Sequence, residues 1–314
     1  MRRAAILVVA LLALLAAGCG TSDSGTSTSK IDGGAPDAPL QAANGPVAPA
    51  AATSPLTLAL TGAPDPVQIR FGHQPRSGLL FDLDTGRVLW RKDPTRILPI
   101  ASVTKIMTAL VVADRVPQGS KVRITKEALA YQGSGVGVLP KNKWIGVSAM
   151  LYGLLLPSGN DAAIALAQRA GKTVPGFVAM MNARASSMGL SCTRYSTPSG
   201  FTDRGNHSCA ADLAVEARAL LDEPRLAKIV GHRQAILPFP IKGGKLYLYN
   251  HNPLLLQRYP GTLGVKTGFT DAAGRCLVAA VKRDGHRLGV VLLHSPDPGG
   301  QAEKLFDRGF RAIS

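Results

Sequence analysis

Acidic and aromatic residues are scarce in this 314-residue chain. It has 20 aspartates and glutamates against 36 lysines and arginines, a formal net charge of +16, and only 5% of its residues are aromatic. The basic residues stand singly, without interleaved aromatic side chains, so the charge does not indicate a nucleic-acid partner. There is no C-x-x-C pair, and the six histidines are scattered. The sequence therefore predicts no metal site and no cofactor.

A hydrophobic run long enough to span a membrane is also missing. The N-terminal run over residues 4–17 has 14 apolar residues, whereas a membrane-spanning helix needs about 20. This run follows Met1-Arg2-Arg3 and precedes small residues, which is the pattern of a secretory signal peptide. We therefore predict a signal peptide over residues 1–18 and export of the rest of the chain.

The residues before Cys19 add a second signal. Ala16-Ala17-Gly18-Cys19 resembles the lipobox of bacterial lipoproteins, in which the cysteine is acylated. The match departs in one respect, because leucine is preferred three residues before the cysteine and Leu15 lies four before it. Ordinary cleavage without a lipid is the alternative. We expect lipidation of Cys19, which would anchor the exported protein at the outer face of the cytoplasmic membrane, in the cell wall.

A low-complexity segment follows the signal. Residues 20–66 are rich in Ser, Thr, Gly, Ala and Pro, carry few charges, and contain one weak apolar patch at 56–60. Such a composition cannot bury enough apolar surface to offset the entropy lost on ordering. We predict a flexible stalk over residues 19–66 and one folded domain over residues 67–314.

Export also changes how the cysteines are interpreted, because an oxidising compartment permits disulfides. Cys192 and Cys209 flank a turn-rich segment. We predict a disulfide between them, which would contribute about 3 kcal/mol by loop-closure entropy. Cys276 lies in a strand-like apolar run and is expected to be a small buried thiol.

The hydrophobic pattern predicts an α+β fold with two lobes. Strands are expected at both ends of the folded part, and Asp84-Thr85-Gly86 and Asp284-Gly285 mark two hairpin turns. Between the strands, apolar residues recur at helical spacing. The predicted strands are 77–82, 88–91, 261–266, 275–282 and 287–294; the predicted helices are 102–115, 147–156, 160–170, 176–188, 211–222 and 301–311.

The first chemical motif, Ser102-Val103-Thr104-Lys105, begins a predicted helix. Residues three apart share a helix face, so the lysine amine can lie beside the serine hydroxyl and take the proton that limits its nucleophilicity. Taken alone, the motif also fits a solvated lysine near a helix-start serine. The same spacing in Ser27-Thr28-Ser29-Lys30 lies in the stalk, where no helix would align it.

Two further motifs follow in order. Ser158-Gly159-Asn160 lies between two predicted helices, where it could serve as a loop and helix cap or as a proton-relaying hydroxyl and a positioning amide. Lys266-Thr267-Gly268 is expected at the end of a strand. An ammonium, a hydroxyl and a glycine together offer an anion site with room for a substrate backbone.

The three motifs together resemble the signature of penicillin-binding proteins and class A β-lactamases. The Ser-Gly-Asn form is similar to that of one branch, the low-molecular-weight D-alanyl-D-alanine carboxypeptidases. The resemblance covers residues 77–310 and includes the segments 158–162, 181–183, 264–270 and 271–274. It implies a β-lactamase/transpeptidase-like fold, with a five-stranded antiparallel sheet flanked by helices and an inserted all-helical lobe.

The resemblance also implies a mechanism. Ser102 would attack the penultimate D-alanine carbonyl of peptidoglycan stem peptides ending in D-Ala-D-Ala, with Lys105 as the neutral base. Ser158 would relay a proton to the leaving amine, and Asn160 would position Lys105 and the substrate. Penicillin and other β-lactams would acylate the same serine as covalent inhibitors.

Substrate binding is assigned to the third motif and the residue after it. Lys266 and Thr267 would hold the terminal carboxylate of the substrate. Gly268 would leave room for the substrate, and the backbone N–H groups of Ser102 and Phe269 would hold the oxyanion.

Two alternatives remain open at this point. A class A-like β-lactamase would need a glutamate some tens of residues after the second motif, and residues 160–215 contain none. A non-catalytic β-lactam-binding lipoprotein of the cell wall would not need Ser102, Lys105 and Lys266 intact. Both are therefore less favoured than a serine carboxypeptidase.

Overall fold

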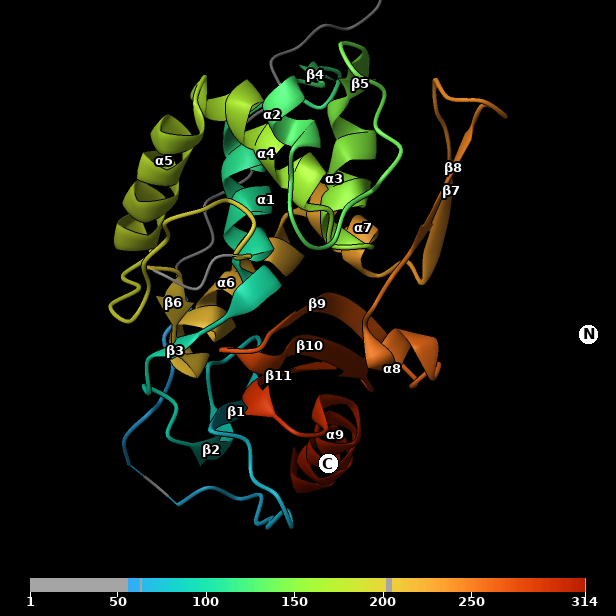
Figure 1. Cartoon of the computed structure of the whole chain (residues 1–314). Coiled ribbons are helices and arrows are strands. Elements are labelled where there is room, and N and C mark those ends of the chain that lie inside the picture. The colour runs from blue at the N-terminus through green and yellow to red at the C-terminus, as the bar shows by residue number, and fades with distance from the viewer. Residues whose placement is uncertain (1–55, 63, 202–204, 314) are drawn as a thin grey trace, which may run out of the picture. The chain divides into compact units, whose positions relative to one another are not determined.

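A five-stranded antiparallel sheet organises the computed structural model, which describes residues 56–62, 64–201 and 205–313. The strands run in the order β2-β1-β11-β10-β9 (Figure 1). Both ends of the folded part contribute to the sheet, which confirms the predicted fold. The strands are β1 (Ser77–Asp82), β2 (Val88–Lys92), β9 (Thr262–Thr270), β10 (Gly274–Arg283) and β11 (His286–Ser295).

Two tight turns set the register of the β1–β2 and β10–β11 strand pairs. Between β1 and β2, the backbone N–H groups of Asp84 and Thr85 both donate to Asp82 Oδ1 at 2.8 Å. Between β10 and β11, Asp284 and Gly285 have φ values of 49° and 84°, as a two-residue hairpin of this twist requires. Both predicted hairpins are confirmed.

Alternate side chains of the sheet enter two different cores. Helix α6 (Ala210–Asp222) packs against one face and α9 (Pro298–Ile313) against the other. On β1, Leu79 and Phe81 enter the core on the α6 side, while Leu80 packs with Phe306 of α9. Because both faces are covered, every residue of β1 is buried.

The middle of the chain forms a second lobe, at the top of Figure 1. Four of the six predicted helices are found there within a few residues, and the other two are α6 and α9 against the sheet. The lobe is not entirely helical, because it also carries a two-stranded ribbon. Its elements are the 3₁₀ turn η1 (Ala101–Thr104), α1 (Lys105–Arg115), β4 (Lys121–Arg123), α2 (Lys126–Leu129), β5 (Trp144–Gly146), α3 (Val147–Leu155), α4 (Asn160–Gly171), α5 (Val174–Ser187) and α7 (Pro224–Val230).

The sequence missed the short elements, which span too few residues to show a period. They include α2, α7 and α8 (Pro253–Leu256), and the pair β3 (Leu98–Pro99) and β6 (His207–Ser208). Strand β9 was also expected to end at residue 266, but it continues to Thr270. Its last residues pair with the start of β10, including Gly268 with Cys276.

The folded part begins earlier than residue 67. The N–H of Ala59 donates to the carbonyl of Gly86 at 3.1 Å, and Arg91 Nε donates to Asp65 Oδ1 at 2.6 Å. Leu56 packs against the main core. Residues 56–62 and 64–66 therefore belong to the folded part and not to the stalk. The predicted signal peptide, Cys19 and the rest of the predicted stalk lie outside the described residues.

None of the helices in the described ranges is long and apolar enough to cross a membrane.

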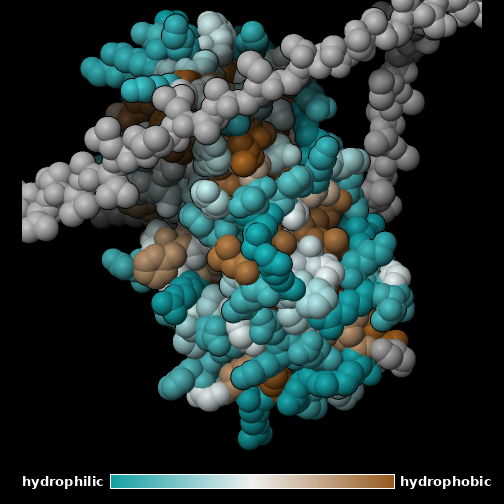
Figure 2. All heavy atoms as spheres, turned by 90° about the vertical axis from the view of Figure 1, so that its right-hand side faces the viewer, coloured by the Kyte–Doolittle hydropathy of each residue, from teal (hydrophilic) through white to brown (hydrophobic). Residues whose placement is uncertain are grey.

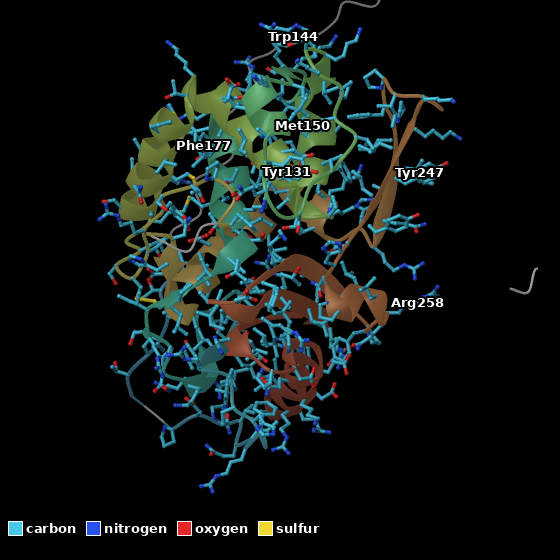
Figure 3. All side chains as sticks on the ribbon, viewed as in Figure 1. Tyr131, Trp144, Met150, Phe177, Tyr247 and Arg258 are labelled. Atoms are coloured by element: carbon cyan, nitrogen blue, oxygen red, sulfur yellow. A yellow bond between two sulfur atoms is a disulfide. The ribbon has the colours of Figure 1, made fainter. Side chains whose placement is uncertain are left out.

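A separate hairpin projects from the right-hand side of Figure 1. It consists of β7 (Gln234–Pro238) and β8 (Lys245–Tyr249), which pair only with each other. Figure 2 shows the molecule from that side, with a mostly hydrophilic surface interrupted by separate hydrophobic patches. Figure 3 shows Tyr247 pointing outwards from the hairpin.

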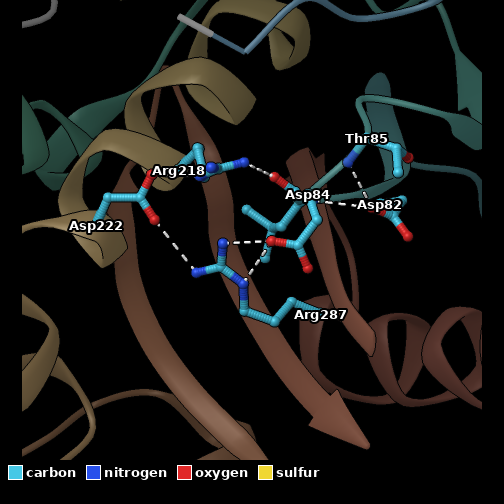
Figure 4. A network of polar contacts seen from close by, with 7 residues as sticks. Asp82, Asp84, Thr85, Arg218, Asp222 and Arg287 are labelled. Carbon is cyan, nitrogen blue, oxygen red and sulfur yellow. Dashed lines mark hydrogen bonds and ion pairs between the residues drawn. The ribbon is translucent and has the colours of Figure 1, made fainter. Parts of the chain in front are cut away.

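A polar network ties α6 to the sheet (Figure 4). Arg287 on β11 donates through Nε to Asp84 at 2.9 Å and through Nη1 to Asp222 at 3.3 Å. Arg218 binds Asp222 and the carbonyl of Leu83. The hydrogen bond from Arg287 lowers the pKa of Asp84 below its ordinary value. The network thus holds the end of α6 against the β1–β2 turn.

The structure contains a disulfide between Cys192 and Cys209, which lies at the start of α6, and Cys276 remains a buried thiol in β10. Asp212, in the first turn of α6, accepts hydrogen bonds from Cys192 N at 2.8 Å and Thr193 Oγ1 at 2.7 Å. The bridge and the carboxylate together fasten the 190s segment to α6.

Replacing both Cys192 and Cys209 by alanine should lower the free energy of unfolding by about 3 kcal/mol, because the unfolded chain gains the entropy of an open loop. Denaturant titration checks this. A reductant should destabilise the wild type and leave the double variant unchanged. Non-reducing peptide mapping that pairs Cys276 would contradict the assignment.

Candidate active site

The site centres on the amine of Lys105. Ser102 lies in the η1 turn and Lys105 begins α1, and in a 3₁₀ turn residues three apart eclipse one another. Lys105 Nζ therefore reaches Ser102 Oγ, at 3.0 Å. The sequence motif predicted this pair, and local helical geometry is enough to form it.

Two acceptors hold the same amine, and both come from distant parts of the chain. Lys105 Nζ donates to Asn160 Oδ1 at 2.7 Å and to the Ser199 carbonyl at 2.7 Å. Asn160 begins α4, and its Nδ2 donates to the Gln132 carbonyl at 2.5 Å. Asn160 was predicted from the sequence. The carbonyls of Ser199 and Gln132 were not, because a backbone acceptor leaves no side-chain signature.

The turn that presents the Ser199 carbonyl depends on a glycine. Gly200 has a φ of +73°, and a Cβ there would lie 1.9 Å from the carbonyl oxygen of Ala101. The backbone of the 197–201 turn thus lies directly against η1. The sequence segment Thr197-Pro198-Ser199-Gly200 is typical of a turn, so the turn could be found but its contact with Lys105 could not.

The environment of Lys105 favours its neutral form. The side chain is fully buried, and burial lowers its pKa well below the ordinary lysine value, because a charged amine is poorly solvated there. The positive charge of Lys266 lowers the pKa further, while Asp161 opposes the shift. A neutral amine 3.0 Å from a serine hydroxyl can accept its proton.

Lys266 is the second buried amine of the site. It lies in β9, is 2% exposed, and donates to the Thr267 carbonyl at 2.9 Å. Burial lowers the pKa of Lys266 to about 7. The amine therefore changes its charge near neutral pH, and it influences Lys105 electrostatically.

Ser158 is buried in a strained conformation. Its φ is +64°, in the left-handed region that a residue with a Cβ rarely adopts. Its Oγ has no hydrogen-bond partner among the described residues. Leaving a buried hydroxyl unpaired costs about 1–3 kcal/mol, and this hydroxyl lines the cavity beside Ser102. Ser158 is therefore available to a bound molecule.

Strand β9 lies close to the start of the η1 turn. A Cβ on Gly268 would lie 2.8 Å from the Ile100 carbonyl and 3.0 Å from Ser102 N. Glycine is thus required at this position by the close approach of two backbones. Ser102 and Phe269, the residue after Gly268, both line the cavity.

A cavity of about 380 Å³ opens in front of these groups. Five of the eight predicted catalytic and binding residues line it: Ser102, Ser158, Thr267, Gly268 and Phe269. Lys105, Asn160 and Lys266 are buried behind that surface. The sequence did not assign the other lining residues to the site; these are Ser134, His251, Pro253, Arg275, Cys276 and Pro298.

Of the described residues that line the cavity, none is an aspartate or a glutamate. Glu216, the first glutamate after the second motif, is fully buried and accepts a hydrogen bond from Tyr195 Oη at 2.5 Å. Burial raises the pKa of Glu216 to about 8, so it is held largely in its neutral form.

A metal centre finds no support in the described ranges. There, the one group of three potential ligand side chains close to one another is Cys192, Cys209 and Asp212. Both sulfur atoms are consumed by the disulfide, and the Asp212 carboxylate is engaged by Cys192 N and Thr193.

Comparisons with known proteins place this site in a family. The sequence profile of the peptidase S11 family, described as D-alanyl-D-alanine carboxypeptidase, matches residues 65–297. The chain belongs to the D-alanyl-D-alanine carboxypeptidase family. The match covers both lobes and all three motifs.

Individual relatives agree. The D-alanyl-D-alanine carboxypeptidase DacF of Bacillus subtilis is 35% identical over 246 residues, which are 76% of this chain and 62% of DacF. DacB2 of Mycobacterium tuberculosis is 38% identical over 241 residues, 74% of this chain and 81% of DacB2. The chain thus spans less than two thirds of DacF.

A solved structure shows the same fold. The D-alanyl-D-alanine carboxypeptidase structure from Mycobacterium tuberculosis superposes with a TM-score of 0.72 at 34% identity, covering 82% of this chain and 96% of that one. The family's β-lactamase-like sheet with its helical lobe is therefore the architecture of this chain.

Lys105→Arg should lower the rate at which penicillin acylates the protein by at least about a hundredfold, the usual contribution of a general base. Arginine keeps the positive charge but cannot release its proton near neutral pH. Fluorescent penicillin labelling followed over time measures this rate. Wild-type labelling by the arginine variant would mean that Lys105 acts only through its charge.

Proposed function

We propose that this protein is a serine-type D-Ala-D-Ala carboxypeptidase that removes the terminal D-alanine from peptidoglycan stem peptides. The observation that carries the proposal is the buried Lys105 amine, which lies 3.0 Å from Ser102 Oγ. Ser102 itself lines a cavity. Family membership supports the choice of substrate.

Acylation begins with proton transfer from Ser102 Oγ to the neutral Lys105 amine. The serine oxygen attacks the carbonyl of the penultimate D-alanine, and negative charge develops on the carbonyl oxygen. The backbone N–H groups of Ser102 and Phe269 donate to that oxyanion. The close approach of Gly268 to Ser102 N supports this assignment, because Phe269 follows Gly268 and both Ser102 and Phe269 line the cavity.

Collapse of the tetrahedral intermediate breaks the peptide bond. The leaving amine of D-alanine takes up the proton held by Lys105, with Ser158 Oγ as the relay. Support comes from the buried, unpartnered hydroxyl of Ser158 on the cavity wall. Asn160 keeps the Lys105 amine in place through the 2.7 Å hydrogen bond between them. Water then hydrolyses the ester on Ser102 and regenerates the enzyme.

The terminal carboxylate of the substrate binds to the third motif. The Lys266 ammonium and the Thr267 hydroxyl are suited to an anion, and Thr267 lines the cavity. Penicillin also carries a carboxylate and presents a strained amide, so it acylates Ser102 along the same path and is released slowly.

A class A-like β-lactamase is less well supported. Such an enzyme uses a glutamate to activate the water that hydrolyses the acyl-enzyme, and the described lining residues include no acid. Glu216 is buried and hydrogen-bonded to Tyr195. A lipoprotein that binds β-lactams without forming an acyl-enzyme is disfavoured, because such an inert module would not need a buried, neutral lysine beside Ser102.

The N-terminal segment supplies the proposed location. A signal peptide over residues 1–18 exports the protein, and a lipid on Cys19 anchors it at the outer face of the cytoplasmic membrane. This part of the proposal is supported by the order of residue types over 1–18, which is basic, then apolar, then small, and by Cys19 directly after them. A stalk of the residues between Cys19 and Leu56 would let the catalytic domain reach the cell wall.

The decisive test is release of free D-alanine from a pentapeptide ending in D-Ala-D-Ala. The wild type should release it, and Ser102→Ala should not, because both turnover and penicillin binding pass through an ester on this serine. Intact-mass spectrometry should show one penicillin adduct on the wild type. An adduct that persists on Ser102→Ala would remove the nucleophile assignment.

Lys266→Ala should lower kcat/KM for the pentapeptide by at least about tenfold, because a charge-assisted hydrogen bond to the carboxylate contributes about 1.5–3 kcal/mol. The same peptide with an amidated C-terminus should be a poor substrate for the wild type and lose far less on mutation. Equal losses for both peptides would assign Lys266 to the chemical step.

Lys266→Arg provides the matched control. Burial lowers the pKa of Lys266 to about 7, so the wild type should lose kcat/KM for the free acid as pH rises through that value and the cation disappears. Arginine stays protonated, and its variant should keep activity to higher pH. If kcat/KM fell at the same high pH in Lys266→Arg as in the wild type, the group that titrates would not be Lys266.

A further inference from the structure

One face of the β7–β8 hairpin is open and carries two tyrosines. Side chains alternate along both strands: Leu246 and Leu248 are buried in the main core, whereas Tyr247 and Tyr249 are 55% and 57% exposed. Ile236 lies directly opposite Tyr247 in the register and is 54% exposed. We call this outward surface the tyrosine face; it consists of Gln234, Ile236, Pro238, Lys245, Tyr247 and Tyr249.

The chemistry of the tyrosine face suits a sugar. An aromatic ring has a negative face, which attracts the slightly positive C–H groups on the flat side of a sugar ring. Tyr247 and Tyr249 are two residues apart on one strand, so their rings are spaced by about 7 Å. Gln234, paired with Tyr249, and Lys245 add hydrogen-bonding groups beside the rings. The surface is therefore amphipathic, as carbohydrate is.

Its size argues against a protein partner. A fully buried aromatic side chain covers about 150–250 Å². Tyr247, Tyr249 and Ile236 are each a little over half exposed as whole residues, so together they offer roughly 300 Å². A stable protein interface needs about 800 Å² from each partner. A few sugar units fit the smaller area.

The tyrosine face is joined to the catalytic cavity by a short, fixed link. Tyr249 is followed by Asn250, whose side chain donates to the carbonyls of Val230 and His232, and then by His251, which lines the cavity with Ser102. Tyr249 lies at most about 7 Å along the chain from His251, and Tyr247 about 14 Å. An extended pentapeptide spans about 17 Å, so a stem peptide is long enough to reach from this face to the edge of the cavity at His251.

We propose that the tyrosine face binds the glycan strand from which the stem peptide branches, so that the enzyme prefers polymeric peptidoglycan to free peptide. This rests on the proposed carboxypeptidase function for its substrate. The sugar rings stack on Tyr247 and Tyr249, and the peptide attached to the strand enters the cavity.

The test compares two substrates and two variants. The substrates are a free pentapeptide and uncross-linked peptidoglycan with pentapeptide stems; D-alanine release is measured for both. The double substitution Tyr247→Ser and Tyr249→Ser should lower kcat/KM on the polymer at least about tenfold, as the loss of two aromatic stacking contacts implies. It should leave the free peptide within about twofold, since neither tyrosine lines the cavity.

Trp144→Ser is the matched control. Trp144 is 60% exposed but lies on β5, at the top of the helical lobe in Figure 3 and away from Tyr247. Its loss should change neither substrate. Penicillin labelling of Ser102 in each variant checks that the catalytic site is intact.

A second measurement does not depend on catalysis. The wild type should co-sediment with peptide-free glycan strands, and the double variant should not. The proposal is overturned if both proteins bind these strands equally, or if the double variant loses activity on free peptide as much as on the polymer. It is also overturned if the two substitutions leave glycan binding unchanged and abolish self-association of the protein, or its binding to anionic lipid vesicles. Failure of the wild type to cleave free peptide would count against the carboxypeptidase function, while glycan binding would still be decided.

Discussion

Three hydrogen bonds to one buried amine hold the catalytic centre together. Lys105 Nζ, as a neutral amine, donates its two N–H groups to Asn160 Oδ1 and to the Ser199 carbonyl, and its lone pair faces the Ser102 hydroxyl at 3.0 Å. These partners belong to α4, to the loop before α6 and to the η1 turn. A buried amine needs such partners because it has lost its water. The same burial lowers its pKa, so one constraint both fixes three elements in place and favours the neutral amine that the proposed mechanism requires.

Two close backbone contacts with the η1 turn depend on glycine, because a Cβ at either glycine would clash with the backbone of the turn. Gly200 lets the 197–201 turn approach Ala101, and Gly268 lets β9 approach Ser102. A methyl group at either position would push a strand or a turn away from η1. The cavity thus forms where the sheet and the helical lobe meet at backbone distance, and Ser158 keeps its unpaired hydroxyl on that cavity.

The proposed glycan surface would extend this design beyond the cleft. The hairpin is anchored to the core by Leu246 and Leu248 and continues into cavity-lining His251. Stacking of sugar rings on the tyrosine face would orient a polymeric substrate without altering the residues that react with it. The cavity alone would recognise the end of the stem peptide. The cavity together with the tyrosine face would also recognise the glycan strand to which the peptide is attached.

The sequence by itself determined the sheet, the long helices, and the pairing of Ser102 with Lys105, because period-two and period-3.6 patterns and i,i+3 spacing are local. The motifs also indicated Asn160 and Lys266 as partners, through family resemblance. Helix α8 was missed, since its four residues are too few to show a period. The β7–β8 hairpin was not recognised, although its two five-residue strands alternate. Only the tertiary structure decided the rest. The Ser199 carbonyl, the low pKa of Lys266 and the open hydroxyl of Ser158 arise from burial and from contacts between residues far apart in sequence, and no local pattern encodes which distant backbone atom will lie beside an amine.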